Sequence, residues 1–370
     1  MLPYGRQTID DADIAAVVEA LRAPMLTCGP LVEQFEQALA TYTGARYVTA
    51  CANGTAALHL AYAALGIGAG DEIITTPITF SATAAAAYYV GATVRVADVD
   101  PRSGNLDLAS VERLINARTR AIVPVHLAGM PVDLAELQQL ARRHDLRVIE
   151  DACHALGATY RGEKIGGGDS DAVVFSFHPV KHITTGEGGA VAVRDARIKA
   201  RLDRLRHHGI QKTATGYDVA ELGWNYRLPD LNCALGISQL KKLDDFVAKR
   251  RALVGWYRDA LAGFVDVPIE PSDRKSSYHL FAVGIDFAQK SRPQVQAELA
   301  ELGVGTQVHY IPLLQHSLHA ARCPGEVSRP RPGADHYYAR TLSLPLYPTL
   351  TQQDVQFVVG ALHRVLGESR

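Results

Sequence analysis

Net charge is almost absent from this chain of 370 residues. Lysine and arginine number 38 and aspartate and glutamate 39, so the formal net charge is 38 − 39 = −1. Without a global positive field, the chain has no electrostatic basis for binding nucleic acid or an anionic membrane. We therefore expect neither partner, and we expect any anionic ligand to be held by a local site.

Cysteine is also scarce. The five cysteines are odd in number and lie far apart in the sequence. No two have the spacing of a metal-binding pair, so we expect no metal site. Reduced thiols fit a cytoplasmic compartment, and residues 1–7 lack the apolar core of a signal peptide. The sequence therefore predicts a cytoplasmic protein with free cysteines.

Long hydrophobic runs are missing too, with one apparent exception. Residues 73–94 carry no charge and are long enough to span a bilayer. However, they contain Pro77, Gly91, five threonines and a serine, and their alanine-rich half is only weakly apolar. We interpret this stretch as a strand, a turn and a buried helix.

What the sequence does contain is an alternation of short apolar runs with helical patterns. We expect helices at residues 10–22, 31–39, 55–65, 81–90, 108–115 and 133–144, and strands at residues 72–76, 93–98, 120–125, 147–150, 171–177 and 189–193. This alternation predicts an α/β fold with a mostly parallel sheet covered on both faces. Ligands of such sheets bind at the carboxyl ends of the strands.

The pattern changes near residue 230. Residues 231–261 have the periodicity of one long helical region, suited to bridge two domains. After it we expect strands at residues 278–285 and 306–311, helices at 293–302 and 352–366, and a loop at 323–333. The sequence therefore predicts a large domain at residues 1–235, then a connecting helix and a small C-terminal α/β domain at residues 236–370. The N-terminal segment would be able to contact the small domain.

Two polar side chains follow buried strands of the large domain. Lys181 lies in a turn that begins near Pro179, shortly after the strand at 171–177, and Asp151 directly follows the strand at 147–150. An amine and a carboxylate at neighbouring strand ends suit pyridoxal phosphate (PLP). Its aldehyde forms a Schiff base with a lysine, and its pyridine nitrogen pairs with an acid. The alternatives are a solvated lysine and a helix-capping aspartate.

A phosphate site is predicted nearby. Asn53, Gly54 and Thr55 come just before a helical pattern. The free N–H groups and the dipole at a helix N-terminus bind phosphate, and glycine allows close approach. Ser176 on the strand before the lysine would donate to the same phosphate. The alternatives are an ordinary helix cap and a buried hydroxyl.

Two ring-bearing residues complete the candidate site. Phe80 follows a strand end and would stack on a planar ring, although an isolated phenylalanine more often packs in a core. His154, three residues after the aspartate, would reach the same ring, although it could be a satisfied polar histidine.

These elements together resemble the fold-type I PLP-dependent sugar aminotransferases of the DegT/StrS family. The resemblance covers nearly the whole chain and rests on the segments at residues 26–30, 53–58, 150–157, 175–189 and 223–231. It implies an aspartate-aminotransferase-like fold with a seven-stranded-type sheet in the large domain. Members of the family act on nucleotide-linked keto sugars.

The resemblance implies a role for each matching residue. Lys181 becomes the Schiff-base lysine and Asp151 the partner of the pyridine nitrogen, with His154 as a further catalytic residue near the ring. The other matches are a phosphate cradle of Gly54, Thr55, Ala56 and Ser176, the stacking Phe80, Asn225 reaching the phosphate from another subunit, and His309 and Tyr310 near the sugar nucleotide. Asn225 thereby implies a homodimer with a shared active site.

Within the family, residues 3–7 and 175–189 most resemble the PseC-type enzymes of pseudaminic acid biosynthesis. This likeness implies amination of a UDP-linked 4-keto-6-deoxy sugar, UDP-2-acetamido-2,6-dideoxy-beta-L-arabino-hexos-4-ulose, with L-glutamate as amino donor. The chain departs from the pattern at His182, where proline is usual, and at Ala52, where serine is common. We expect His182 to alter the sugar contacts.

Four alternatives remain open. The substrate could be a different nucleotide-linked keto sugar, of the perosamine or 4-amino-arabinose type. PLP-dependent sugar dehydratases of the family carry histidine at the Schiff-base position, whereas this chain has Lys181 with His182 beside it. A non-catalytic scaffold would be expected to lack Lys181 or Asp151. A nicotinamide oxidoreductase needs a glycine-rich turn between strand and helix, whereas the glycines at 66–70 precede a strand.

Overall fold

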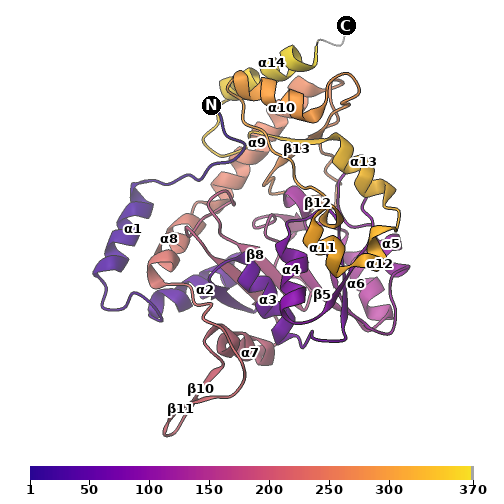
Figure 1. Ribbon diagram of the computed structural model, residues 1–370. Helices are drawn as coiled ribbons and strands as arrows, with labels where there is room; N and C mark the ends of the chain where they lie inside the picture. The colour runs from indigo at the N-terminus through magenta and orange to yellow at the C-terminus, as the bar shows by residue number, and fades with distance from the viewer. Residues whose placement is uncertain (368–370) are drawn as a thin grey trace.

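A computed structural model describes residues 1–367, and its centre is a seven-stranded sheet (Figure 1). In the order β1-β9-β8-β5-β4-β2-β3, the strands are Tyr47–Cys51, Gly189–Val193, Ala172–Ser176, Arg147–Asp151, Thr119–Val123, Glu72–Thr75 and Thr93–Val96. The pairs β5–β8, β4–β5, β2–β4 and β2–β3 are parallel, whereas β9 is antiparallel to both β8 and β1. The predicted mostly parallel α/β sheet is confirmed.

Helices cover both faces of this sheet. They are α1 (Asp11–Arg22), α2 (Pro30–Thr43), α3 (Gly54–Ala64), α4 (Ala82–Tyr89), α5 (Leu108–Glu112), α6 (Leu134–Arg143), α7 (Ala196–Arg206) and α8 (Asp230–Leu240). In β8, Ala172 and Val174 pack into the core under α3 and α4, whereas Val173 and Phe175 pack into the core under α2 and α8. Because both faces are buried, the strand has the apolar run that the sequence shows.

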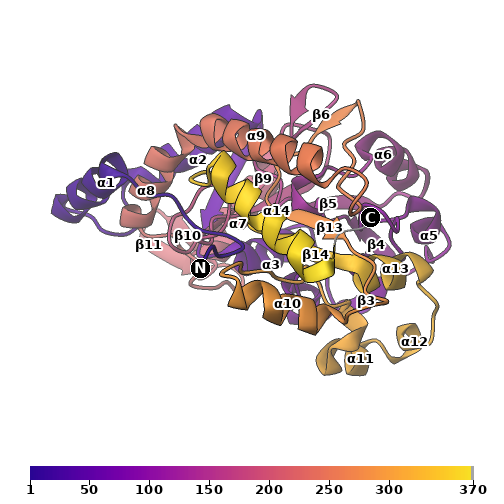
Figure 2. The same ribbon diagram turned by 90° about the horizontal axis from the view of Figure 1, so that it is seen from above.

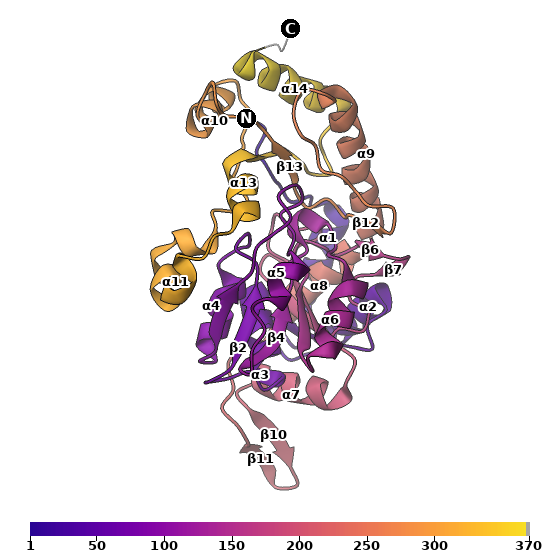
Figure 3. The same ribbon diagram turned by 90° about the vertical axis from the view of Figure 1, so that its right-hand side faces the viewer.

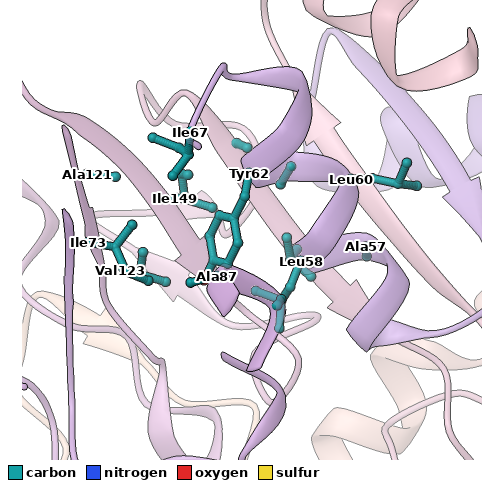
Figure 4. Close-up of a cluster of buried hydrophobic side chains, with 14 of the residues drawn as sticks. Ala57, Leu58, Leu60, Tyr62, Ile67, Ile73, Ala87, Ala121, Val123 and Ile149 are labelled. Atoms are coloured by element: carbon teal, nitrogen blue, oxygen red, sulfur yellow. The ribbon is translucent and has the colours of Figure 1, made fainter. Parts of the chain in front are cut away.

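The core under α3 is built around Tyr62. Its ring is fully buried and lies among aliphatic side chains that include Ile73 and Ile149 (Figure 4). Its hydroxyl donates a hydrogen bond of 2.9 Å to the carbonyl oxygen of Thr83. This packing fixes α3 against α4 and the sheet, and therefore fixes the position of the α3 N-terminus.

A second core lies in the C-terminal part of the chain (Figures 2 and 3). Its elements are α9 (Leu243–Leu261), β13 (Phe281–Gly284), α10 (Arg292–Glu301), β14 (Thr341–Leu344) and α14 (Gln352–Leu366). Leu2 packs against this core and pairs with Val304. The predicted division after residue 235 falls within α8 and stays a prediction.

The predicted single helical region at 231–261 is two helices. The chain breaks between α8 and α9 at Lys241 and Lys242, where the N–H of Lys242 bonds the carbonyl of Gln239 in a turn. Leu240 and Leu243, on either side of the break, bury in the same cluster. The apolar spacing therefore continues through the turn, which is why the sequence pattern did not reveal it.

Two further predictions beyond α9 were wrong. The segment predicted as a strand at 306–311 makes only an isolated bridge, between Gln307 and Ser343, because most of it lines a cavity instead. The segment predicted as a loop at 323–333 contains α12 (Pro324–Val327) and the start of α13 (Pro332–Arg340). Each of these helices has a proline in its first turn, where the missing N–H costs nothing.

Several short elements were not anticipated. They are the strand pair β6 (Thr159–Tyr160) and β7 (Glu163–Lys164) with β12 (Arg274–Lys275), the hairpin of β10 (Ile210–Thr213) and β11 (Gly216–Val219), and α11 (Ser317–Arg322). The hairpin extends away from the rest of the chain (Figures 1 and 3). Within residues 1–367, no helix is long and apolar enough to cross a membrane, and no cluster of side chains is suited to a metal ion.

The close packing of α8 against α2 at Gly236 can be tested by its effect on stability. A Cβ on Gly236 would lie 2.6 Å from Phe35 and 2.8 Å from Thr185, whereas a Cβ on Gly255 of α9 would meet nothing within 4 Å. Gly236→Ala should therefore overpack the contact and cost about 1–3 kcal/mol. Gly255→Ala should instead add up to about 1 kcal/mol through helix propensity. Thermal unfolding would show opposite shifts in Tm, and equal shifts would contradict this packing.

Candidate active site

The carboxyl edge of the sheet opens into a cavity of about 1170 Å³. Asp151 is the last residue of β5 and Ser176 the last of β8, and these two strands are paired in register. The chain then turns back, and the N–H of Lys181 bonds the carbonyl of His178 at 2.9 Å. Asp151, Ser176 and Lys181 all line the cavity, so the structure brings together the residues predicted from the strand ends.

Lys181 is half-buried at this edge. Burial lowers the pKa of its amine, and the nearby Cys153 and Asp151 oppose this shift only in part. A lowered pKa increases the fraction of neutral amine near neutral pH, and the neutral form is the one that attacks a carbonyl carbon. The environment therefore prepares this lysine to act as a nucleophile.

Asp151 is a buried carboxylate held by two hydrogen bonds. The hydroxyl of Thr83 donates to Oδ2 at 2.7 Å, and the N–H of Cys153 donates to Oδ1 at 3.2 Å. Such bonds compensate for the loss of water and fix the orientation of the carboxylate. The sequence did not point to Thr83, because it lies in the uncharged stretch at residues 73–94 without a local signal of function.

The N-terminus of α3 forms a cradle beside Ser176. Asn53 caps the helix by accepting a hydrogen bond of 2.8 Å from the N–H of Ala56, and Gly54, Thr55 and Ala56 line the cavity. A Cβ on Gly54 would lie 3.0 Å from Cβ of Ser176 and 3.3 Å from Sγ of Cys153. Only glycine leaves this space open, and helix N-termini favour phosphate. The residues present thus fit the phosphate, the ring and the aldehyde of PLP.

Several ring-bearing residues also line the cavity. His154 and Tyr310 lie nearly parallel with centroids 6.0 Å apart, and His154 Nε2 is 3.1 Å from the Tyr310 hydroxyl. Phe80 is 61% exposed, and its centroid is 6.2 Å from that of Tyr310. His309 also lines the cavity, but its Nδ1 is paired with the Ser343 hydroxyl at 2.9 Å. Burial lowers the pKa of His309 to about 3, so it is neutral.

Asn225 is the one predicted site residue that the structure does not bring to this cavity. It is exposed and forms an isolated bridge with His207, while its neighbours Trp224 and Tyr226 line the cavity. His182, which was expected to alter the sugar contacts, does not face this cavity either. Among the described residues, those that line the cavity do not include His182, and its Nε2 bonds the carbonyl of Ser277 at 3.1 Å.

Other residues that line the cavity were not predicted from the sequence. They include His59, Tyr89, Trp224 and Tyr226, whose rings pack against one another, and His279. Trp224 and Tyr226 flank Asn225 in the segment at 223–231, so their positions could have been noticed. The others come from segments without any local pattern of function.

Comparisons with known proteins find relatives over almost the whole chain. Residues 7–363 match the DegT/DnrJ/EryC1/StrS aminotransferase family. The UDP-4-amino-4,6-dideoxy-N-acetyl-beta-L-altrosamine transaminase of Campylobacter jejuni, serotype O:23/36, is 39% identical over 376 residues, which cover 99% of this chain and 98% of the relative.

Solved structures give the same result. PseC of Helicobacter pylori, an aminotransferase involved in the biosynthesis of pseudoaminic acid, superposes with a TM-score of 0.93 at 33% identity over 98% of each chain. The PLP form of a putative sugar aminotransferase, Spr1654 of Streptococcus pneumoniae, superposes with a TM-score of 0.91 at 27% identity, again over 98% of each chain. The predicted family resemblance, fold type and cofactor are confirmed. The chain belongs to the DegT/DnrJ/EryC1/StrS aminotransferase family and is a PLP-dependent aminotransferase.

Proposed function

We propose that this enzyme transfers an amino group from L-glutamate to C4 of UDP-2-acetamido-2,6-dideoxy-beta-L-arabino-hexos-4-ulose, in the cytoplasm, as a step of pseudaminic acid biosynthesis. The observation that carries the reaction type is the pairing of β5 with β8, which brings Asp151 and the Lys181 turn to one cavity. Similarity to the Campylobacter transaminase and to PseC supports the choice of sugar.

The cofactor, when bound, supplies an electrophilic aldehyde carbon and an electron-withdrawing ring. Lys181 Nζ would hold that carbon in the resting enzyme. Once the amine of the donor has displaced it, the same nitrogen, in its neutral form, would take the proton from Cα of the donor, and in the second half-reaction it would deliver a proton to C4 of the sugar. The carboxylate of Asp151, oriented by Thr83, holds a proton on the pyridine nitrogen.

The rest of the cavity is suited to the sugar nucleotide. Its volume of about 1170 Å³ is larger than most single-ligand pockets, so a cofactor and a second ligand can be present together. Phe80, which is exposed, and Tyr310, which is partly buried, line the cavity with ring centroids 6.2 Å apart, and their aromatic surface suits a planar ring.

The role of Lys181 is tested by Lys181→Ala. We expect turnover to fall by about 10³-fold or more, because both the covalent attachment and the proton transfer are lost. The visible absorbance of the lysine-bound cofactor should also disappear. Lys249→Ala, on an exposed position of α9, is the matched control and should change neither. Normal turnover in Lys181→Ala would overturn the assignment.

The proposed sugar is tested by separating the two half-reactions. L-Glutamate alone should bleach the absorbance of the bound cofactor, and a panel of UDP- and TDP-linked 4-keto sugars is then added. The proposed UDP-sugar should restore the absorbance fastest, because it accepts the amino group that L-glutamate left on the cofactor. Mass spectrometry should then find a 4-amino sugar. Faster restoration by another sugar would replace the substrate. An elimination product would indicate a dehydratase.

The proposed homodimer is tested by complementation between chains. If Asn225 completes the site of the partner subunit, a hybrid of Lys181→Ala and Asn225→Ala chains has one intact site and one doubly altered site. Each variant alone should be weakly active, and the mixed, co-refolded chains should regain activity, approaching half that of the wild type per hybrid dimer. No gain on mixing would show that Asn225 does not act across subunits.

A further inference from the structure

The cavity contains few cations for a site that binds anionic ligands. Among residues 1–367, those that line it include one lysine, Lys181, and no arginine. The acidic side chains there are Asp151 and Glu187. Six histidines line it as well, namely His59, His154, His178, His279, His309 and His316. Since the proposed chemistry occupies Lys181, a neutral N–H group is what this chain itself offers to a carboxylate of an amino-acid donor.

Of these six histidines, His279 has the position that best suits a hydrogen-bond donor to the cavity. It lies in the segment between β12 and β13 that crosses from one core to the other, and it is only 4% exposed. Its ring centroid is 4.4 Å from that of His154 and 5.6 Å from that of His182. Within the described chain, Nδ1 of His279 is buried without a hydrogen-bond partner. The nitrogen with which this side chain reaches the cavity is therefore Nε2.

The location of the ring proton follows from this burial. Desolvation, assisted by the charge of Lys181, lowers the pKa of His279 well below its ordinary value, so the ring is neutral and carries one N–H. An N–H on buried Nδ1 would have no acceptor, which is costly. A tautomer with the proton on Nε2 avoids the cost of this unpaired N–H and directs a hydrogen-bond donor to the cavity.

Arg250 of α9 fixes the backbone of the segment that carries His279. Its buried guanidinium donates to the carbonyl oxygens of Tyr278, His279 and Leu346 at 3.3, 3.2 and 3.0 Å. Among the ion pairs of residues 1–367, Arg250 has no carboxylate partner. Its uncompensated charge disfavours a proton on His279 and His182, while its hydrogen bonds fix the His279 backbone.

We propose that His279 binds the amino donor: its Nε2–H donates a hydrogen bond to a carboxylate of the donor beside Lys181. Arg250 is a positioning residue for this contact. The inference rests on the proposed aminotransferase reaction and adds the group that recognises the amino donor. His154 does not compete for this role, because its Nε2 is paired with Tyr310.

Three substitutions at one position test the inference in the holoenzyme. The amide nitrogen of glutamine approximates Nε2 of histidine, and that of asparagine approximates Nδ1. The probes are L-glutamate and its α-methyl analogue, which keeps both carboxylates but has no Cα hydrogen. Their dissociation constants are measured from the change in absorbance of the bound cofactor, and the KM of the keto sugar is measured separately.

His279→Phe and His279→Asn should weaken both probes about 10–100-fold, the range for a lost hydrogen bond to a charged group. His279→Gln should bind both probes with dissociation constants within about threefold of those of the wild type, because the N–H hydrogen-bond donor is kept. The KM of the keto sugar should be unchanged in all three variants. His336→Phe, at an exposed position of α13, is the control and should leave binding of both probes intact.

The possible outcomes separate this inference from the proposed function. Unchanged binding of both probes by His279→Phe would overturn the donor contact while leaving the reaction intact. If His279→Phe does not retain the cofactor, equal affinities of the Gln and Asn variants would overturn the contact instead. Failure of L-glutamate to bleach the cofactor in the wild type, despite binding of the α-methyl analogue, would count against the proposed donor and not against His279.

Discussion

The pairing of β5 with β8 is the interaction on which the rest of the site depends. Asp151 lies opposite Val174 in a parallel register, so β8 continues for two residues beyond it and ends at Ser176. The same strand end then leads into the turn that carries Lys181. Because both strands are buried on both faces, a shift of one residue in this register would exchange core and opposite-face side chains along β8. The core packing therefore fixes the relative positions of the acid and the amine.

The other parts of the site are attached to these two strand ends. Gly54 lies close to Ser176, where an added Cβ would be only 3.0 Å from the serine Cβ, and this close approach keeps the α3 N-terminus beside β8. Thr83 reaches Asp151 from α4, and the buried Tyr62 connects α3 to the backbone of Thr83. The expected phosphate cradle and the expected partner of the pyridine nitrogen are thus joined through one packed unit of sheet and two helices.

The sequence was informative where function coincides with a local pattern. Asp151 and Lys181 were found because each follows an apolar run, and the glycine of the α3 cradle was found because it opens a helical pattern. Thr83 and His279 were not found, since each acts on residues 68 or more positions away and nothing in its own segment differs from ordinary core. The segment around Tyr310 was predicted to be a strand because its β-branched and aromatic residues favour strands, but residues 307–311 line the cavity instead.

Segments from the C-terminal part of the chain contribute to the site through hydrogen bonds to His154 and His182. Tyr310 bonds His154, and Ser277 in the crossing segment accepts from His182. Arg250 on α9 bonds the same crossing segment and the carbonyl of Leu346, which packs in the C-terminal core. Since each of these imidazoles is buried and has a pKa well below its ordinary value, the bonds are made by neutral rings. A displacement of the segments that carry Ser277 and Tyr310 would therefore alter the environment of His154 and His182 together, and both histidines lie near Lys181.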